Sequence, residues 1–144
     1  MTLEEIQKLW ERDAEIDRTE LGEESLKIPQ LHSKYYKIFS QERLLLRKFQ
    51  NEEISLKAKK REYFLGLMDP EELHNLGWEP QPLQILKADV GEYIASDPDM
   101  IQSDQKRAYQ QEKVDFLDNI IRSLVNRGFN IKSAIDWEKF KVGI

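Results

Sequence analysis

The stretch from Pro29 to Phe64 constrains the fold most, because it contains no further proline and no glycine before Gly66. Proline is favoured at the first position of a helix, and glycine just past its end. We therefore predict a single helix over residues 29–64. At 1.5 Å per residue it would be roughly 54 Å long, against a radius of gyration of about 15 Å for a compact chain of this size. The predicted protein is therefore elongated, or its long helix is covered by other subunits.

Two patterns share this predicted helix. An apolar stripe, mostly one heptad apart, consists of Leu31, Ile38, Leu45, Phe49, Leu56 and Tyr63. A basic cluster at the helix end consists of Lys57, Lys59, Lys60 and Arg61, followed by Phe64. Cations beside an aromatic ring suit single-stranded nucleic acid, which offers phosphates and stackable bases. A charge run can equally be a solvated helix face, so from composition both interpretations stay open.

The charge pattern sets the basic cluster apart from the rest of the chain. The net charge of the whole chain is −5. Residues 34–61 carry nine basic and three acidic side chains, a net of +6, whereas residues 1–27 have a net of −5 and residues 62–144 a net of −6. Such asymmetry indicates a charged partner, and the acidic flanks would restrict contact with DNA to one zone.

The remaining segments also read as helices. Thr2 and Glu5 form a capping box for a first helix, and Asp17 to Ile28 reads as a short helix or turn. Asp69 and Pro70 begin a short helix ending near Leu76. A further helix is predicted from Leu83 to Ile94, with Leu83, Leu86, Val90 and Ile94 facing inward, before a turn at residues 96–99.

The C-terminal region is predicted to be a helical hairpin. A long helix from about Met100 to Arg127 would end at Gly128, and a last amphipathic helix would run from Phe129 to Phe140. The expected fold is therefore all-α, with two long helices and shorter packing helices that assemble through helical contacts. We expect one helical domain over residues 1–144, made of an N-terminal arm (1–27), the basic-ended helix (28–66), a loop with short helices (67–98) and the hairpin (99–144).

No signature of catalysis or of a cofactor occurs in the sequence. Phosphate-cradling glycine motifs are absent, the chain has no cysteine, and its two histidines, His32 and His74, are far apart. Adjacent carboxylates such as Glu52 and Glu53 point about 100° apart on a helix and cannot form one acid–base site. We therefore predict a protein that is not an enzyme and that uses no cofactor or metal. No apolar run is long enough for a membrane span, and residues 1–13 do not resemble a signal peptide.

Several segments follow one another in collinear order along almost the whole chain. They are MTLEEIQ with Ile16–Asp17 and Thr19 to Leu21, LHSKYYK, LKAKKREYFLG from Leu56 to Gly66, Leu86 to Asp89, and NRGFNIKSAIDWEKFKVG from Asn126 to Gly143. This series resembles the UvsY family of phage recombination mediators, and residues 67–82 match that family poorly.

The resemblance implies a small acidic protein that binds single-stranded DNA and forms rings of six or seven subunits. It implies contacts with a RecA-like recombinase and with the single-strand-binding protein, in the cytoplasm of the infected bacterial host. The basic pair that serves DNA binding would correspond to Lys57 and Lys59, with Lys60 and Arg61 as neighbours. Self-association would use the C-terminal seam, with Leu117, Ile120, Ile121, Leu124, Phe129, Ile135 and Phe140.

Two other functions remain open from the residues alone. One is a helical adaptor or scaffold that binds no nucleic acid. The other is a small hydrolase whose site is assembled from distant residues. Binding that falls steeply with salt would separate the DNA-binding function from the adaptor, because phosphate contacts release counterions.

Overall fold

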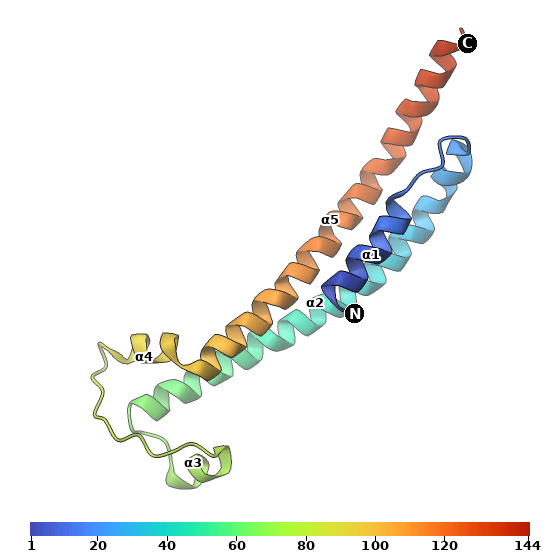
Figure 1. Cartoon of the computed structure of the whole chain (residues 1–144). Helices are drawn as coiled ribbons and strands as arrows, with labels where there is room; N and C mark the ends of the chain where they lie inside the picture. Colours follow the sequence, from blue (N-terminus) through green and yellow to red (C-terminus); the bar gives the residue numbers. More distant parts are fainter. The chain divides into compact units, whose positions relative to one another are not determined.

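A computed structural model describes residues 1–144 as five α-helices with no β-strand (Figure 1). The helices are α1 (Leu3–Ala14), α2 (Leu21–Phe64), α3 (Pro70–Leu76), α4 (Val90–Ser96) and α5 (Pro98–Lys141). The predicted all-α class with two long helices is thus confirmed, and α2 and α5 have 44 residues each.

The chain divides into two compact units. Unit 1 contains Met1–Leu45 and Gln110–Ile144, and unit 2 contains Leu46–Tyr109. The helices α2 and α5 each contribute to both units, and they pair antiparallel within each one.

The start of α2 differs from the prediction, because the helix begins at Leu21 and Pro29 lies inside it. The start is determined by a turn in which Asp17 accepts hydrogen bonds from the Thr19 backbone N–H (2.9 Å) and hydroxyl (2.6 Å). An interior proline removes one helical hydrogen bond. The helix nevertheless includes Pro29, because the turn at Asp17 starts it upstream of the proline. The end is as predicted: Gly66 has a φ of 71°, and the Leu67 N–H bonds the Glu62 carbonyl at 2.9 Å.

The predicted C-terminal hairpin is wrong, because α5 runs through Gly128 without interruption. Gly128 does not adopt a positive φ, and a Cβ built on it would lie 3.9 Å from the Ile28 side chain. A glycine inside a helix costs about 1 kcal/mol relative to alanine. Leu124 and Ile131, on either side of it, are both buried on the same face of α5. Continuous packing along this face therefore outweighs the preference of glycine for a helix end.

Unit 1 has its core between α1, α2 and α5. Ile6, Tyr35, Leu117 and Leu124 have 0% of their surface exposed. Polar groups are buried with partners: Glu42 pairs with Lys113 at 3.1 Å and accepts a hydrogen bond from Gln110 at 2.6 Å. A side-chain network of this kind fixes how the helices pair.

Unit 2 has a smaller core of Val90, Ile94 and Met100, packed against residues of α2. The short helix α3 begins as predicted, because the Asp69 carboxylate accepts a hydrogen bond from the Glu71 N–H at 2.9 Å. The predicted helix from Leu83 is wrong in its first half: α4 begins only at Val90, and Leu83 and Leu86 are exposed. Two prolines, at positions 80 and 82, precede this segment and favour extended backbone over helix.

Candidate nucleic-acid interface

Three cations of the basic cluster are exposed at the C-terminal end of α2. Lys57, Lys59 and Arg61 all face solvent, and none of them forms an ion pair within the chain. They lie on the last turns of α2, before the helix ends ahead of Gly66, and so on a helical segment of unit 2. Their charges are therefore free to meet an anionic partner.

The fourth cation, Lys60, is buried, with 4% of its surface exposed. Its ammonium lies 3.2 Å from a carboxylate oxygen of Asp97 and 2.8 Å from one of Asp99. The ammonium also lies 4.1 Å from the centre of the Trp78 ring. Burial alone would lower the pKa of Lys60, but hydrogen bonds to Asp99 and Asp97 outweigh it and raise that pKa above its ordinary value.

Lys60 is thus unavailable to a phosphate, contrary to its place among the predicted DNA contacts. Asp97 also caps α5, because its carboxylate accepts hydrogen bonds from the backbone N–H groups of Asp99 (3.0 Å) and Met100 (3.1 Å). The ammonium therefore fixes the start of α5 against α2 within unit 2.

Phe64 is likewise a packing residue in the structure. It is half-buried and packs against the Val90–Ile94–Met100 core. Its ring centre lies 5.2 Å from that of Tyr63 and 5.8 Å from that of Tyr93. A ring held on several sides in this way offers little free face to a nucleobase.

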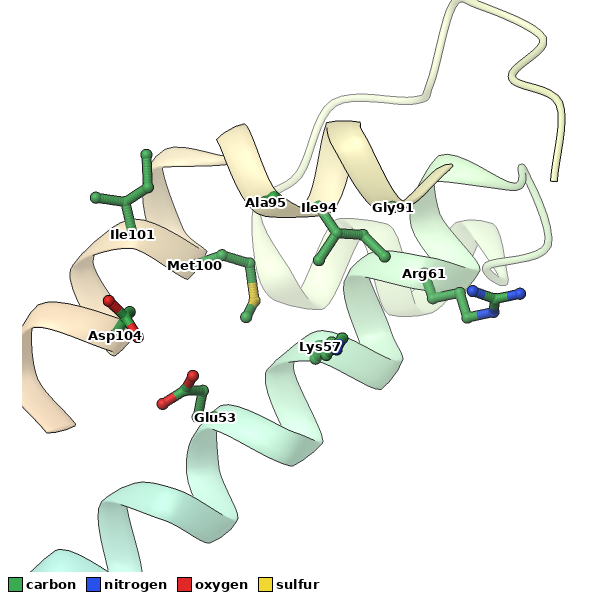
Figure 2. Close-up of a pocket in the computed structure, with 9 residues that line it drawn as sticks. All are labelled: Glu53, Lys57, Arg61, Gly91, Ile94, Ala95, Met100, Ile101 and Asp104. Carbon is green, nitrogen blue, oxygen red and sulfur yellow. The ribbon is translucent and has the colours of Figure 1, made fainter. Parts of the chain in front are cut away.

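Sequence reasoning missed a groove of about 480 Å³ that borders the exposed cations (Figure 2). Lys57 and Arg61 line it from α2, and the apolar side chains of Ile94, Met100 and Ile101 line it from α4 and α5. These residues are far apart in sequence, and only the folding of α4 and α5 onto α2 brings them together. No local pattern could have indicated the groove.

The acidic residues of the groove share one arginine that lies outside its lining. Glu53 and Asp104 face each other at the end of the groove away from Arg61 (Figure 2). Arg107 pairs with both of them, at 2.6 Å from Glu53. Lys57 and Arg61 have no ion-pair partner, and together with Arg107 they leave the groove and its edge with a net charge of +1.

The residues predicted for self-association fall into two groups. Leu117, Ile120 and Leu124 are buried in unit 1, so they are not available to a second copy of the chain. Ile121 and Ile135 are half-buried. Phe129 and Phe140, in contrast, are 70% and 72% exposed. Val125 and Trp137 are also exposed, and the rings of Trp137 and Phe140 stack with centres 5.5 Å apart.

No group of three or more His, Asp or Glu side chains is arranged to hold a metal ion. None of the five helices combines the length and the apolar character that crossing a bilayer requires.

Comparison with solved structures gives several close matches of fold. Three crystal structures of the bacteriophage T4 recombination mediator protein UvsY resemble the chain. In lattice type IV the identity is 23%, covering 97% of this chain and 99% of that one, with a TM-score of 0.85. In lattice type II the identity is 24%, covering 99% of this chain and 98% of that one, with a TM-score of 0.84. In lattice type I the identity is 22%, covering 95% of this chain and 98% of that one, with a TM-score of 0.81.

Comparison by sequence identifies the family. No curated protein matches the chain. Residues 9–144 match the family model described as "Recombination, repair and ssDNA binding protein UvsY". Since this match covers nearly the whole sequence, the chain belongs to the UvsY family of recombination, repair and single-stranded-DNA-binding proteins.

Proposed function

We propose that this chain is a non-catalytic recombination mediator that holds single-stranded DNA at Lys57, Lys59 and Arg61. The observation that carries this proposal is that these three cations are exposed and unpaired in a chain whose family binds single-stranded DNA. Because the chain as a whole has a net charge of −5, the strand would be repelled elsewhere and confined to this zone.

A ring of several copies would turn weak contacts into firm binding. Three cations in one subunit bind a strand weakly, but linked sites gain from effective concentration without any new contact. The exposed apolar stripe of Val125, Phe129, Trp137 and Phe140 on α5 is the surface we propose for contact between copies. At about 100° per residue, these four side chains fall within an arc on the order of 120° on one helix face.

In this proposal the ring presents the strand to a RecA-like recombinase and helps to displace the single-strand-binding protein. The protein of similar fold from bacteriophage T4 is a recombination mediator, which supports this role. The site of action would be the cytoplasm of the infected bacterial host.

Fluorescence anisotropy with labelled oligo-dT tests the DNA contact. The double variant Lys57→Glu/Arg61→Glu should lose binding, and the milder Lys57→Ala/Arg61→Ala should reduce the salt slope by roughly 1.4 per protomer engaged, about 0.7 for each lost phosphate contact. Lys87→Glu is a matched control, since Lys87 is exposed in the loop before α4 and forms no ion pair. Unchanged affinity in the double charge reversal would refute these DNA contacts, and binding that is independent of salt would favour the adaptor instead.

Native mass spectrometry tests the assembly. Phe129→Asp and Phe140→Asp should shift the oligomer toward smaller species, because each places a charge on the proposed apolar contact. Leu86→Asp is the control, since Leu86 is 69% exposed outside α5. An oligomer mass that is the same in all three variants would rule out this stripe as the contact between copies.

A further inference from the structure

We infer that the groove beside Lys57 and Arg61 takes up a nucleobase of the bound strand, so that the protein reads single-strandedness and not charge alone. This inference rests on the proposed function and adds to it a second, apolar subsite. Its basis is the side-by-side placement of two exposed cations without ion-pair partners and an apolar floor in unit 2 (Figure 2).

The chemistry of the groove matches the two parts of a nucleotide. Lys57 and Arg61 lie one helical turn apart on α2, where neighbouring side chains are roughly 5–6 Å apart, and both can reach phosphate oxygens. The side chains of Ile94, Met100 and Ile101 offer an apolar surface to the face of a base. The volume of about 480 Å³ lies within the roughly 300–1,000 Å³ typical of sites that enclose small ligands.

Electrostatics favour a nucleotide over other occupants of the groove. The carboxylates of Glu53 and Asp104 share Arg107, which balances one of their two negative charges. Lys57 and Arg61 then give the groove and its edge a net charge of +1. The remaining charge is positive and lies beside apolar surface. An apolar side chain of an acidic peptide is the competing occupant, and the experiment below separates the two.

The same geometry explains why duplex DNA would be a poor ligand. In a duplex the bases are stacked and paired, and extracting one costs a few kcal/mol. In a single strand a base can turn into the groove while its flanking phosphates meet Lys57 and Arg61. Preference for single strands then follows from the apolar floor, since cations alone bind both forms of DNA.

Gly91 provides a way to fill the groove without removing any contact. It lines the groove on α4, its φ is not positive, and nothing lies within 4 Å of a Cβ built on it. Leucine at this position has a higher helix propensity than glycine, and its side chain would extend from the open Cβ position into the groove that Gly91 lines. The matched control is Gly22→Leu, since Gly22 also lies in a helix with open space around its Cβ position but does not line this groove.

The experiment compares oligo-dT with an all-abasic oligonucleotide of the same length, which keeps the phosphates but has no bases. The unchanged protein should bind oligo-dT about 5-fold more tightly than the abasic strand, the lower end of the range for one held base, because the floor of the groove is aliphatic and the upper end belongs to aromatic stacking. Gly91→Leu should bring oligo-dT binding close to the abasic level and leave abasic binding, duplex binding and the salt slope unchanged. Gly22→Leu should behave like the unchanged protein.

Ile101→Ala is a second variant that keeps the inference testable if Gly91→Leu fails to fold, because Ile101 is half-exposed at the groove and its truncation leaves the Val90–Ile94–Met100 core intact. It should lower oligo-dT affinity several-fold and leave abasic binding unchanged. The inference is overturned if the groove variants keep the full preference for oligo-dT, the result expected of a peptide groove, or if they weaken both oligonucleotides equally. Absence of oligo-dT binding by the unchanged protein would overturn the proposed function as well.

Discussion

Replacing Lys60 by methionine tests whether this residue of the basic cluster has a structural role. Methionine keeps a long flexible stem against Trp78 but removes the ammonium that pairs with Asp97 and Asp99. If Lys60 fixes the start of α5, the variant should lose stability in unit 2 and keep its DNA contacts.

The expected loss of stability depends on which partners the carboxylates of Asp97 and Asp99 retain once the ammonium is gone. Removing one partner of a buried ion pair costs about 3–5 kcal/mol, since it leaves an uncompensated charge. Asp99 is half-exposed and regains water, and Asp97 retains two backbone N–H donors, at 3.0 and 3.1 Å. We therefore expect the lower end, about 3 kcal/mol, which corresponds to a fall in Tm of roughly 6–12 °C.

Far-UV circular dichroism measures the thermal transition, and hydrogen–deuterium exchange locates the loss. Peptides covering residues 90–101 should exchange faster in Lys60→Met, whereas peptides of α1 should be unaffected. Adding Asp97→Asn should recover much of the loss, because asparagine still caps a helix and leaves no unpaired charge at that position. The reasoning is refuted if exchange over residues 90–101 is unchanged while oligo-dT affinity and salt slope fall as in Lys57→Ala, since Lys60 would then bind phosphate.

Two further predictions concern unit 1. Burial alone would raise the pKa of Glu42, but hydrogen bonds from Gln110 and Lys113 outweigh it and hold that pKa below its ordinary value of 4.5. The stability that ionised Glu42 contributes is thus complete above pH 4.5 and is lost as the pH falls through the lowered pKa. Glu42→Gln should therefore cost about 2 kcal/mol at neutral pH and flatten the acid side of a plot of urea midpoint against pH. A plot parallel to that of the unchanged chain would contradict this. Gly128→Ala should raise the urea midpoint, by about 0.5–1 kcal/mol in free energy of unfolding, because its Cβ would meet Ile28 at an ordinary 3.9 Å inside a continuous helix. A loss of stability would instead indicate that Gly128 ends a helix.

Local chemistry in the sequence was sufficient for the helix ends that depend on a few neighbouring residues. The capping box of Thr2 and Glu5, the Asp69 cap and the Gly66 stop were all predicted and all occur. Each depends on hydrogen bonds within about one turn of backbone, so the residues that form them are close together in the sequence. Pro29 and Gly128 were misread for the opposite reason, since packing across α2 and α5 overrides their local preference.

The apolar stripe on α2 likewise shows what the local sequence pattern predicts and what packing between helices decides. Leu45 and Leu56, which the heptad spacing assigned to this stripe, are only half-buried. The most buried face of α2 includes Glu42 and Lys60, whose partners come from α5 and from the corner before it. A periodicity drawn from apolar residues alone cannot include charged residues that are buried with a partner.

By itself the sequence determined the all-α class, the two long helices, the confinement of positive charge to residues 34–61 and the family resemblance that the comparison confirmed. Only the tertiary structure decided which cations are free. Lys57 and Lys60 are three residues apart and identical in chemistry, yet one lines an open groove and the other is buried between two carboxylates and an indole ring. The physical reason is that the availability of a charge depends on its partners, and the partners of Lys60 lie some 40 residues further along the chain, at the start of α5.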